Sequence, residues 1–131
     1  MIVVHHNPKC GTSRNVLSAI RASGTEPVVI EYLKEGWTRA QLLGLFAAAG
    51  LSPRAALRAD ASEATGLEEA GDDALVDAMI RYPVLVNRPI VCSSRGVRLC
   101  RPAEAVLDLL EGPLPAGFLK EDGRPMAAKG R

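Results

Sequence analysis

The chain has 131 residues, 47% of them hydrophobic, which is typical of one domain with its own apolar core. Its 16 Lys and Arg nearly balance its 15 Asp and Glu, and this argues against a nucleic-acid partner, because such proteins carry a basic stripe. No stretch approaches the roughly 18 apolar residues of a membrane-spanning helix, so we expect no membrane partner either.

The first part of the chain shows a strand–helix–strand pattern. Apolar runs at 2–4 and 28–30 predict two short strands, and helically spaced apolar residues between them predict a helix over about 12–22. Gly24 suits the end of that helix. Because connections of this kind cross over with right-handed geometry, we expect the two strands to pair in parallel.

Helices dominate the middle of the chain. Thr38 and Gln41 fit a capping box, which predicts a helix that begins there and ends at Gly50. A serine–proline pair predicts a short helix over 53–57, because serine suits the N-cap and proline the first helical position. Helically spaced apolar residues predict another helix from about 72 to 81.

Strands return in the last third of the chain. Apolar triplets at 84–86 and 90–92 predict two strands, and 97–99 extends the second into a hairpin. Pro102 then opens a last helix that runs to about residue 110. Prolines and glycines follow in quick succession, so we expect a loosely held tail.

This element order predicts an α/β fold in two layers, in which both strand regions share one small sheet. We interpret the whole chain, 1–131, as a single domain. Its core comprises 1–35 and 83–112, a helical insertion occupies 37–82, and the tail covers 113–131.

Cys10 is the strongest functional candidate, because it follows the first strand and directly precedes a helix. A cysteine at this position faces unpaired backbone N–H groups and the positive end of the helix dipole. Both favour the thiolate, which is the nucleophilic form. The amides of Gly11 and Thr12 at the start of the helix can also hold an anion.

Two common chemistries of such a cysteine are excluded by spacing. A phosphatase loop needs an arginine six residues after the cysteine, where this chain has Val16. A dithiol redox site needs a second cysteine at position 13, which is Ser13. Cys92 and Cys100 are expected to pack in the core. Cys10 is therefore predicted to act alone, with a partner thiol from elsewhere.

With three cysteines, at least one cannot join an internal disulfide pair. The first residues also lack the basic leader and the long apolar run of a signal peptide. We therefore expect a cytoplasmic protein whose thiols are reduced.

Three arginines are candidates for binding an oxyanion, because guanidinium donates two parallel hydrogen bonds. Arg58 follows the short helix, Arg88 lies between two apolar triplets, and Arg101 precedes the last helix. The alternative for each is an ion pair with a nearby carboxylate such as Asp60 or Glu104.

His6 lies next to the cysteine loop and has two possible roles. It could stabilise the thiolate or move a proton, or it could bond a backbone group without any chemical role. We predict no metal site, because adjacent histidines on a strand diverge and no third ligand is suitably spaced. Pro89 follows Arg88 in a tight link, where a cis peptide bond is expected.

With these residues in view, the chain closely resembles the glutaredoxin-linked arsenate reductases of bacteria. The resemblance implies a thioredoxin-like fold: a small mixed four-stranded sheet flanked by helices, with a helical insertion. The segments that carry it are His6-Asn7-Pro8-Lys9-Cys10-Gly11-Thr12-Ser13-Arg14-Asn15, Ser23-Gly24-Thr25-Glu26-Pro27, Asn87-Arg88-Pro89-Ile90-Val91, Arg98-Leu99-Cys100-Arg101-Pro102 and Lys120-Glu121-Asp122-Gly123.

The resemblance also implies residue roles. Cys10 would attack the arsenic of arsenate and form a covalent thiol–arsenate adduct. His6 matches a histidine that helps to lower the pKa of the nucleophile, and Ser13 matches a serine hydrogen-bonded to the thiolate. The arginines that match the family's oxyanion-binding positions are Arg58, Arg88 and Arg101.

The family relies on external thiols as partners, and the chain is expected to hold no bound cofactor. Glutathione, as co-substrate, would attack the adduct, and glutaredoxin would reduce the resulting mixed disulfide while arsenite is released. Two alternatives stay open. One is a redox-responsive regulator of the same fold that binds RNA polymerase, and the other is an arsenate-reductase-like protein without activity.

Overall fold

The computed structural model describes residues 1–126. Contacts divide the chain into two compact units. The first combines Met1–Glu31 with the chain from Arg88 onward, and the second is Tyr32–Asn87. The prediction that all of this forms one domain is not tested by this division and stays a prediction.

The first unit is built on a four-stranded sheet in the order β2-β1-β3-β4. β1 and β2 run parallel, as the strand–helix–strand pattern predicts, whereas β3 is antiparallel to both β1 and β4. This mixed sheet confirms the thioredoxin-like α/β fold that the sequence predicts. The strands are β1 (Val3–His6), β2 (Val28–Glu31), β3 (Ile90–Ser93) and β4 (Gly96–Leu99).

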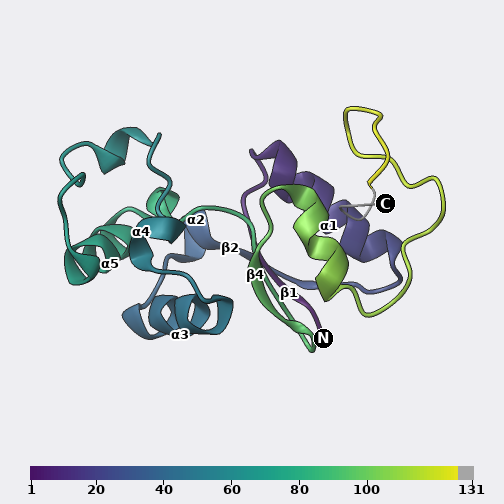
Figure 1. Ribbon diagram of the computed structural model, residues 1–131, viewed down its shortest axis with the longest axis horizontal. Helices are drawn as coiled ribbons and strands as arrows, with labels where there is room; N and C mark the ends of the chain where they lie inside the picture. The colour runs from purple at the N-terminus through teal and green to yellow at the C-terminus, as the bar shows by residue number, and fades with distance from the viewer. Residues whose placement is uncertain (127–131) are drawn as a thin grey trace. The chain divides into compact units, whose positions relative to one another are not determined.

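Two helices pack against one face of this sheet, α1 (Gly11–Ala22) and the 3-10 helix η3 (Ala103–Leu109). Figure 1 shows them side by side, α1 in purple and η3 in light green. The fully buried members of their shared core come from both helices, from β1 and β3, and from residues directly beside β1 and β4: Ile2, Val4, Val16, Ala19, Ile20, Val91, Cys100 and Val106.

The last helix differs in type from the expected one. Its buried residues Ala103, Val106 and Leu109 are spaced by three, and side chains at that spacing eclipse one another in a 3-10 helix. A spacing of three also fits one face of an α-helix, so the apolar pattern alone does not distinguish the two types.

The second unit is helical, as the predicted insertion is. The Thr38 hydroxyl accepts a hydrogen bond from the Gln41 amide at 3.1 Å, and the Gln41 side chain accepts one from the Thr38 amide at 2.8 Å. Gly50 ends that helix with a φ of 67°, which only glycine adopts freely. The helices are α2 (Tyr32–Glu35), α3 (Arg39–Ala49), α4 (Pro53–Ala56), η1 (Ser62–Ala64), α5 (Asp72–Arg81) and η2 (Pro83–Leu85).

The prediction of a strand at 84–86 is wrong. Residues Pro83–Leu85 form the 3-10 helix η2, with proline at its first turn. Only Val86 makes strand-like pairing, in an isolated antiparallel bridge with Leu57. A short apolar run predicts burial, which both Leu85 and Val86 show, but it does not determine the backbone conformation.

Within residues 1–126, none of the helices is both long and apolar enough to cross a lipid bilayer.

Two adjacent leucines of α3 give a test of core packing. Leu42 is fully buried, whereas its neighbour Leu43 is 47% exposed. Leu42→Ala should lower the free energy of unfolding by about 2–5 kcal/mol, because it removes buried methyl groups and leaves a cavity. Leu43→Ala should change it by no more than about 0.5 kcal/mol. Urea denaturation followed by circular dichroism measures both, and equal losses would contradict the assigned helix face.

Candidate active site

Cys10 is the N-cap residue of α1, at the point where the chain leaves β1 and enters the helix. Its carbonyl accepts the first helical hydrogen bond from the Arg14 amide at 3.0 Å. Its own amide donates to the Asn7 carbonyl at 3.1 Å, which closes the turn between strand and helix. The side chain is only 8% exposed, so the sulfur lies at the helix N-terminus with little contact to water.

A buried polar cluster fixes this turn. The Ser13 hydroxyl oxygen lies 2.7 Å from His6 Nδ1 and accepts a hydrogen bond from the Asn7 amide at 3.1 Å. The Asn7 side chain in turn accepts from the Lys9 amide at 2.9 Å. His6, Asn7 and Ser13 are all buried, so the end of β1 and the first turn of α1 are joined by bonds shielded from water.

Asn7 is a residue of the site for which the sequence predicts no role, although an asparagine directly before a proline is a recognised signal for a turn. Its side chain caps the loop on which Cys10 lies, and its backbone amide joins the Ser13 cluster.

His6 contacts the loop of Cys10 through the Ser13 hydroxyl, and its burial disfavours a charged imidazole. Burial lowers the pKa of His6 below its usual value, with Glu31 opposing the shift and the charges of Arg21 and Arg14 adding to it. The imidazole is therefore neutral at neutral pH. Since the Ser13 oxygen already accepts from Asn7, its hydroxyl proton is available to His6 Nδ1.

Arg101 is the side chain that reaches the sulfur. Its Nη1 donates to Cys10 Sγ at 3.5 Å and to the backbone carbonyl of Arg88 at 3.2 Å. The structure thus brings together two of the three predicted anion-binding arginines with Cys10, although 91 residues separate Arg101 from the cysteine. Pro89 is buried, and both the Arg88–Pro89 bond and the unpredicted Arg101–Pro102 bond are cis.

Opposing effects set the pKa of Cys10. Burial raises it, because the thiolate loses hydration. The backbone N–H of Ser13, the hydrogen bond from Arg101 and the charges of Arg88 and Arg101 all lower it, and together they outweigh burial. The pKa of the Cys10 thiol consequently lies below its ordinary value. The contact of Ser13 with the sulfur is made by its backbone amide, while its hydroxyl bonds His6 and Asn7.

The other two cysteines show the opposite behaviour. Burial raises the pKa of Cys100 to about 12, against a small lowering by Arg98, and burial also raises the pKa of Cys92. All three cysteines are free of disulfide bonds. Of the three thiols, only Cys10 is shifted toward the reactive thiolate.

Arg58 belongs to the second unit, so its expected role in binding the anion stays a prediction. Its Nε lies 3.5 Å from the Asp60 carboxylate, the ion pair that the sequence offers as an alternative. The corresponding pair between Arg101 and Glu104 is not found among residues 1–126, where Glu104 pairs with Lys120 at 2.6 Å.

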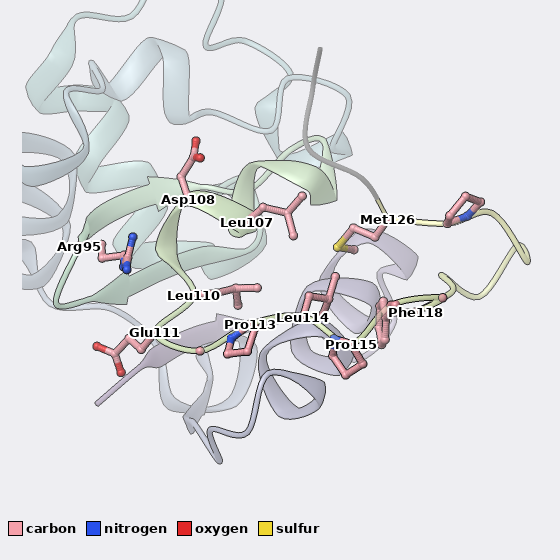
Figure 2. Close-up of a pocket in the computed structure, with 14 residues that line it drawn as sticks. Arg95, Leu107, Asp108, Leu110, Glu111, Pro113, Leu114, Pro115, Phe118 and Met126 are labelled. Atoms are coloured by element: carbon pink, nitrogen blue, oxygen red, sulfur yellow. The ribbon is translucent and has the colours of Figure 1, made fainter. Parts of the chain in front are cut away.

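A separate hollow of about 740 Å³ lies in the first unit, between η3 and the C-terminal segment. Figure 2 shows its lining, which includes Leu107, Leu110, Leu114, Phe118 and Met126. None of the residues around Cys10 lines it. This hollow is therefore separate from the candidate site around Cys10.

The three thiols provide a test of the site within one molecule. Iodoacetamide should label Cys10 first, with a pH dependence whose inflection lies below that of an ordinary cysteine, because only the thiolate reacts. Cys100 should stay unlabelled in the folded protein at neutral pH, since it is fully buried and its pKa is about 12. Peptide mass spectrometry after timed labelling measures both rates, and equal rates would contradict an activated Cys10.

A family model described as the ArsC family matches residues 5–109. The chain is 63% identical over 127 residues to arsenate reductase ArsI2 of Synechocystis sp., covering 94% of this chain and 91% of that protein. It is 50% identical over 126 residues to an arsenate reductase of Escherichia coli K12, covering 93% and 89% of the two chains. The solved arsenate reductase of Vibrio cholerae superposes with a TM-score of 0.78 at 37% identity, covering 83% of this chain and 97% of that one. These similarities confirm the resemblance inferred from the sequence: the chain belongs to the ArsC family.

Proposed function

We propose that this protein is an arsenate reductase that converts arsenate to arsenite through a covalent adduct on Cys10. The observation that carries the proposal is the contact of Arg101 with the Cys10 sulfur at the N-terminus of α1. This arrangement supports a thiolate and a bound anion in the same place. The relatives named arsenate reductase support arsenate as that anion.

Arsenate is a tetrahedral oxyanion, and the groups proposed to bind it are hydrogen-bond donors. The amides of Gly11 and Thr12 lie in the first turn of α1, where helix N–H groups have no helical acceptor. Arg88 and Arg101 add guanidinium charge beside the sulfur. Arg58 is proposed as a third arginine, on the basis of the family resemblance.

The proposed first step forms a bond between Cys10 Sγ and arsenic. One arsenate oxygen leaves as water, after taking up two protons, so arsenic stays As(V) in the adduct. Reduction to As(III) needs two electrons, and two thiols supply them when their sulfurs join in a disulfide. The overall balance is H₃AsO₄ + 2 RSH → H₃AsO₃ + RSSR + H₂O.

The second half of this reaction is proposed to use thiols from outside the chain. Burial raises the pKa values of Cys92 and Cys100, which disfavours their thiolate forms and argues against either as the thiol that attacks the adduct. Glutathione as co-substrate and glutaredoxin as reductant fit this need and follow from the family resemblance. A chemistry that consumes thiols requires a reducing compartment, which supports a cytoplasmic location.

The proposed activity is tested by following NADPH oxidation in the presence of arsenate, glutathione, glutathione reductase and glutaredoxin. We expect turnover that depends on both arsenate and glutaredoxin, and that Cys10→Ser abolishes, because a serine hydroxyl is a far weaker nucleophile than a thiolate at neutral pH. Cys92→Ser is the matched control and should retain turnover.

Absence of turnover above background, or full activity of Cys10→Ser, would contradict the proposal. A regulator of the same fold would instead associate stably with RNA polymerase without reducing arsenate. A pull-down with purified RNA polymerase, run beside the coupled assay, distinguishes that case from an inactive relative, which would do neither.

The anion site is tested by comparing two arginines. Arg88→Ala should weaken arsenate or sulfate binding about tenfold or more, because it removes a charge close to the Cys10 sulfur. Arg39→Ala is the control, since Arg39 forms ion pairs with Asp73 and Asp77 on the surface of the other unit. Titration calorimetry measures both, and equal effects would count against a specific pocket.

A further inference from the structure

We propose that Glu121 is a positioning residue for the nucleophile: it holds Arg14 against the backbone carbonyl of Pro8 and thereby fixes the loop on which Cys10 lies. The kinetic consequence of this proposal rests on the arsenate reductase activity proposed above. The other part of the proposal, that Glu121 controls how readily the Cys10 thiol ionises, does not depend on which substrate the protein uses.

The guanidinium of Arg14 bridges the Cys10 loop and the segment around Glu121, and it uses a different nitrogen for each. Its Nη1 donates to the Pro8 carbonyl at 2.9 Å, two residues before Cys10. Its Nε donates to the Glu121 carboxylate, at 2.7 Å to Oε1 and 3.3 Å to Oε2. Because the guanidinium is rigid, the position of the carboxylate determines where Nη1 lies and so supports the Pro8 carbonyl.

Glu121 is itself held in place by a C-terminal turn, residues 118–126. The Glu121 amide donates to the Asn15 side chain of α1 at 2.9 Å. Next to it, Lys120 pairs with Glu104 of η3 at 2.6 Å. The turn also closes on itself through a bond of 3.3 Å from the Met126 amide to the Phe118 carbonyl.

The far end of the turn is anchored in the core, because Met126 is only 7% exposed and packs in the cluster between α1, η3 and the sheet. The Glu121 carboxylate is therefore presented by a segment that is attached at several points, which a positioning role requires.

The Arg14–Glu121 pair also lies directly over the start of α1. A Cβ atom placed on Gly11 would lie 3.6 Å from Arg14 Nη2 and 3.8 Å from a Glu121 carboxylate oxygen. Gly11 follows Cys10 and offers one of the helix-start amides proposed to bind the anion. Arg14 thus bonds the nucleophile loop at Pro8, before the cysteine, and the pair occupies the space beside Gly11, after it.

Stability alone does not account for this arrangement. The side chains of Arg14 and Glu121 are 44% and 49% exposed, and exposed ion pairs contribute little to folding. The same helix carries a comparable exposed pair, Arg21 with Glu26 at 3.1 Å. The hydrogen bonds that Arg21 makes go to Glu26, whereas those of Arg14 extend to the loop of the nucleophile. Glu26→Gln is therefore a matched control for Glu121→Gln.

Charge and positioning predict opposite signs for the thiol. By charge alone, Glu121→Gln would lower the pKa of Cys10, because a nearby negative charge disappears. Positioning predicts that the pKa rises, because the loop loosens and the thiolate is held less closely by its donors. Arg14→Lys gives a second test, since it keeps the positive charge but its ammonium cannot replace the planar bridge between Pro8 and Glu121.

The experiment measures the pH dependence of Cys10 alkylation by iodoacetamide for the wild type, Glu121→Gln, Arg14→Lys and Glu26→Gln. It is paired with kcat/KM for arsenate in the coupled assay. We expect Glu121→Gln and Arg14→Lys each to raise the inflection and to lower kcat/KM about fivefold. Glu26→Gln should leave both quantities unchanged.

The proposal is overturned if Glu121→Gln lowers the inflection, as charge alone requires, or if neither Glu121→Gln nor Arg14→Lys differs from Glu26→Gln. If the wild type does not reduce arsenate, the proposed function fails, and the alkylation profiles still decide the role of Glu121.

Discussion

The geometry of the candidate active site depends on one buried, hydrogen-bonded serine. Ser13 is fully buried in the first turn of α1, and its hydroxyl joins the amide of Asn7 and the ring of His6 at the end of β1. Buried polar groups without partners are costly, so these three groups favour one relative placement of strand and helix. That placement holds Cys10 at the N-terminus of α1. The helix dipole, the Ser13 amide and the contact with Arg101 can act on the sulfur only because this junction is fixed.

Burial by itself would raise the pKa of Cys10, as it raises that of Cys100 in the same chain. Cys10 and Cys100 are both buried, yet the pKa of Cys100 is raised to about 12 and that of Cys10 is lowered. The difference lies in the neighbours: Cys100 follows a strand among apolar side chains, whereas Cys10 faces a helix amide and Arg101. The lowered pKa of Cys10 is therefore a property of the helix N-terminus and its donors, and His6, whose own pKa is lowered by burial, bonds Ser13 beside them.

Local signals were sufficient for most of the fold but not for the site. The capping box at Thr38 can be recognised from residues within one helical turn. The position of Cys10 just before α1 can likewise be predicted from its immediate neighbours in the sequence. The apolar run at 84–86 predicts burial correctly but backbone conformation wrongly. Three apolar residues in a row are too few to show the spacing that distinguishes a strand from a helix. A contact between segments far apart in the chain leaves no pattern in the sequence around either residue. Arg101 is a candidate from its place before the last helix, but its link to Cys10, 91 residues away, is implied only by the family resemblance. The bond from Arg14 to Glu121 spans 107 residues and is not predicted at all.

The near balance of 16 basic and 15 acidic residues conceals how charge is distributed, because pairing decides which arginines remain able to bind an anion. Most of the arginines with described ion pairs are neutralised by a carboxylate at the surface, as Arg14, Arg21, Arg39 and Arg98 are. Within residues 1–126, the hydrogen bonds described for Arg101 go to a sulfur and a carbonyl, so its charge is not cancelled there by a carboxylate. In the proposed function, an incoming oxyanion would take up the remaining donors of its guanidinium without displacing an acidic side chain. The pairing of Glu104 with Lys120 helps to keep Arg101 without a carboxylate partner, because Glu104 is the acidic residue nearest to Arg101 in the sequence. The guanidinium of Arg101 is then directed at Cys10.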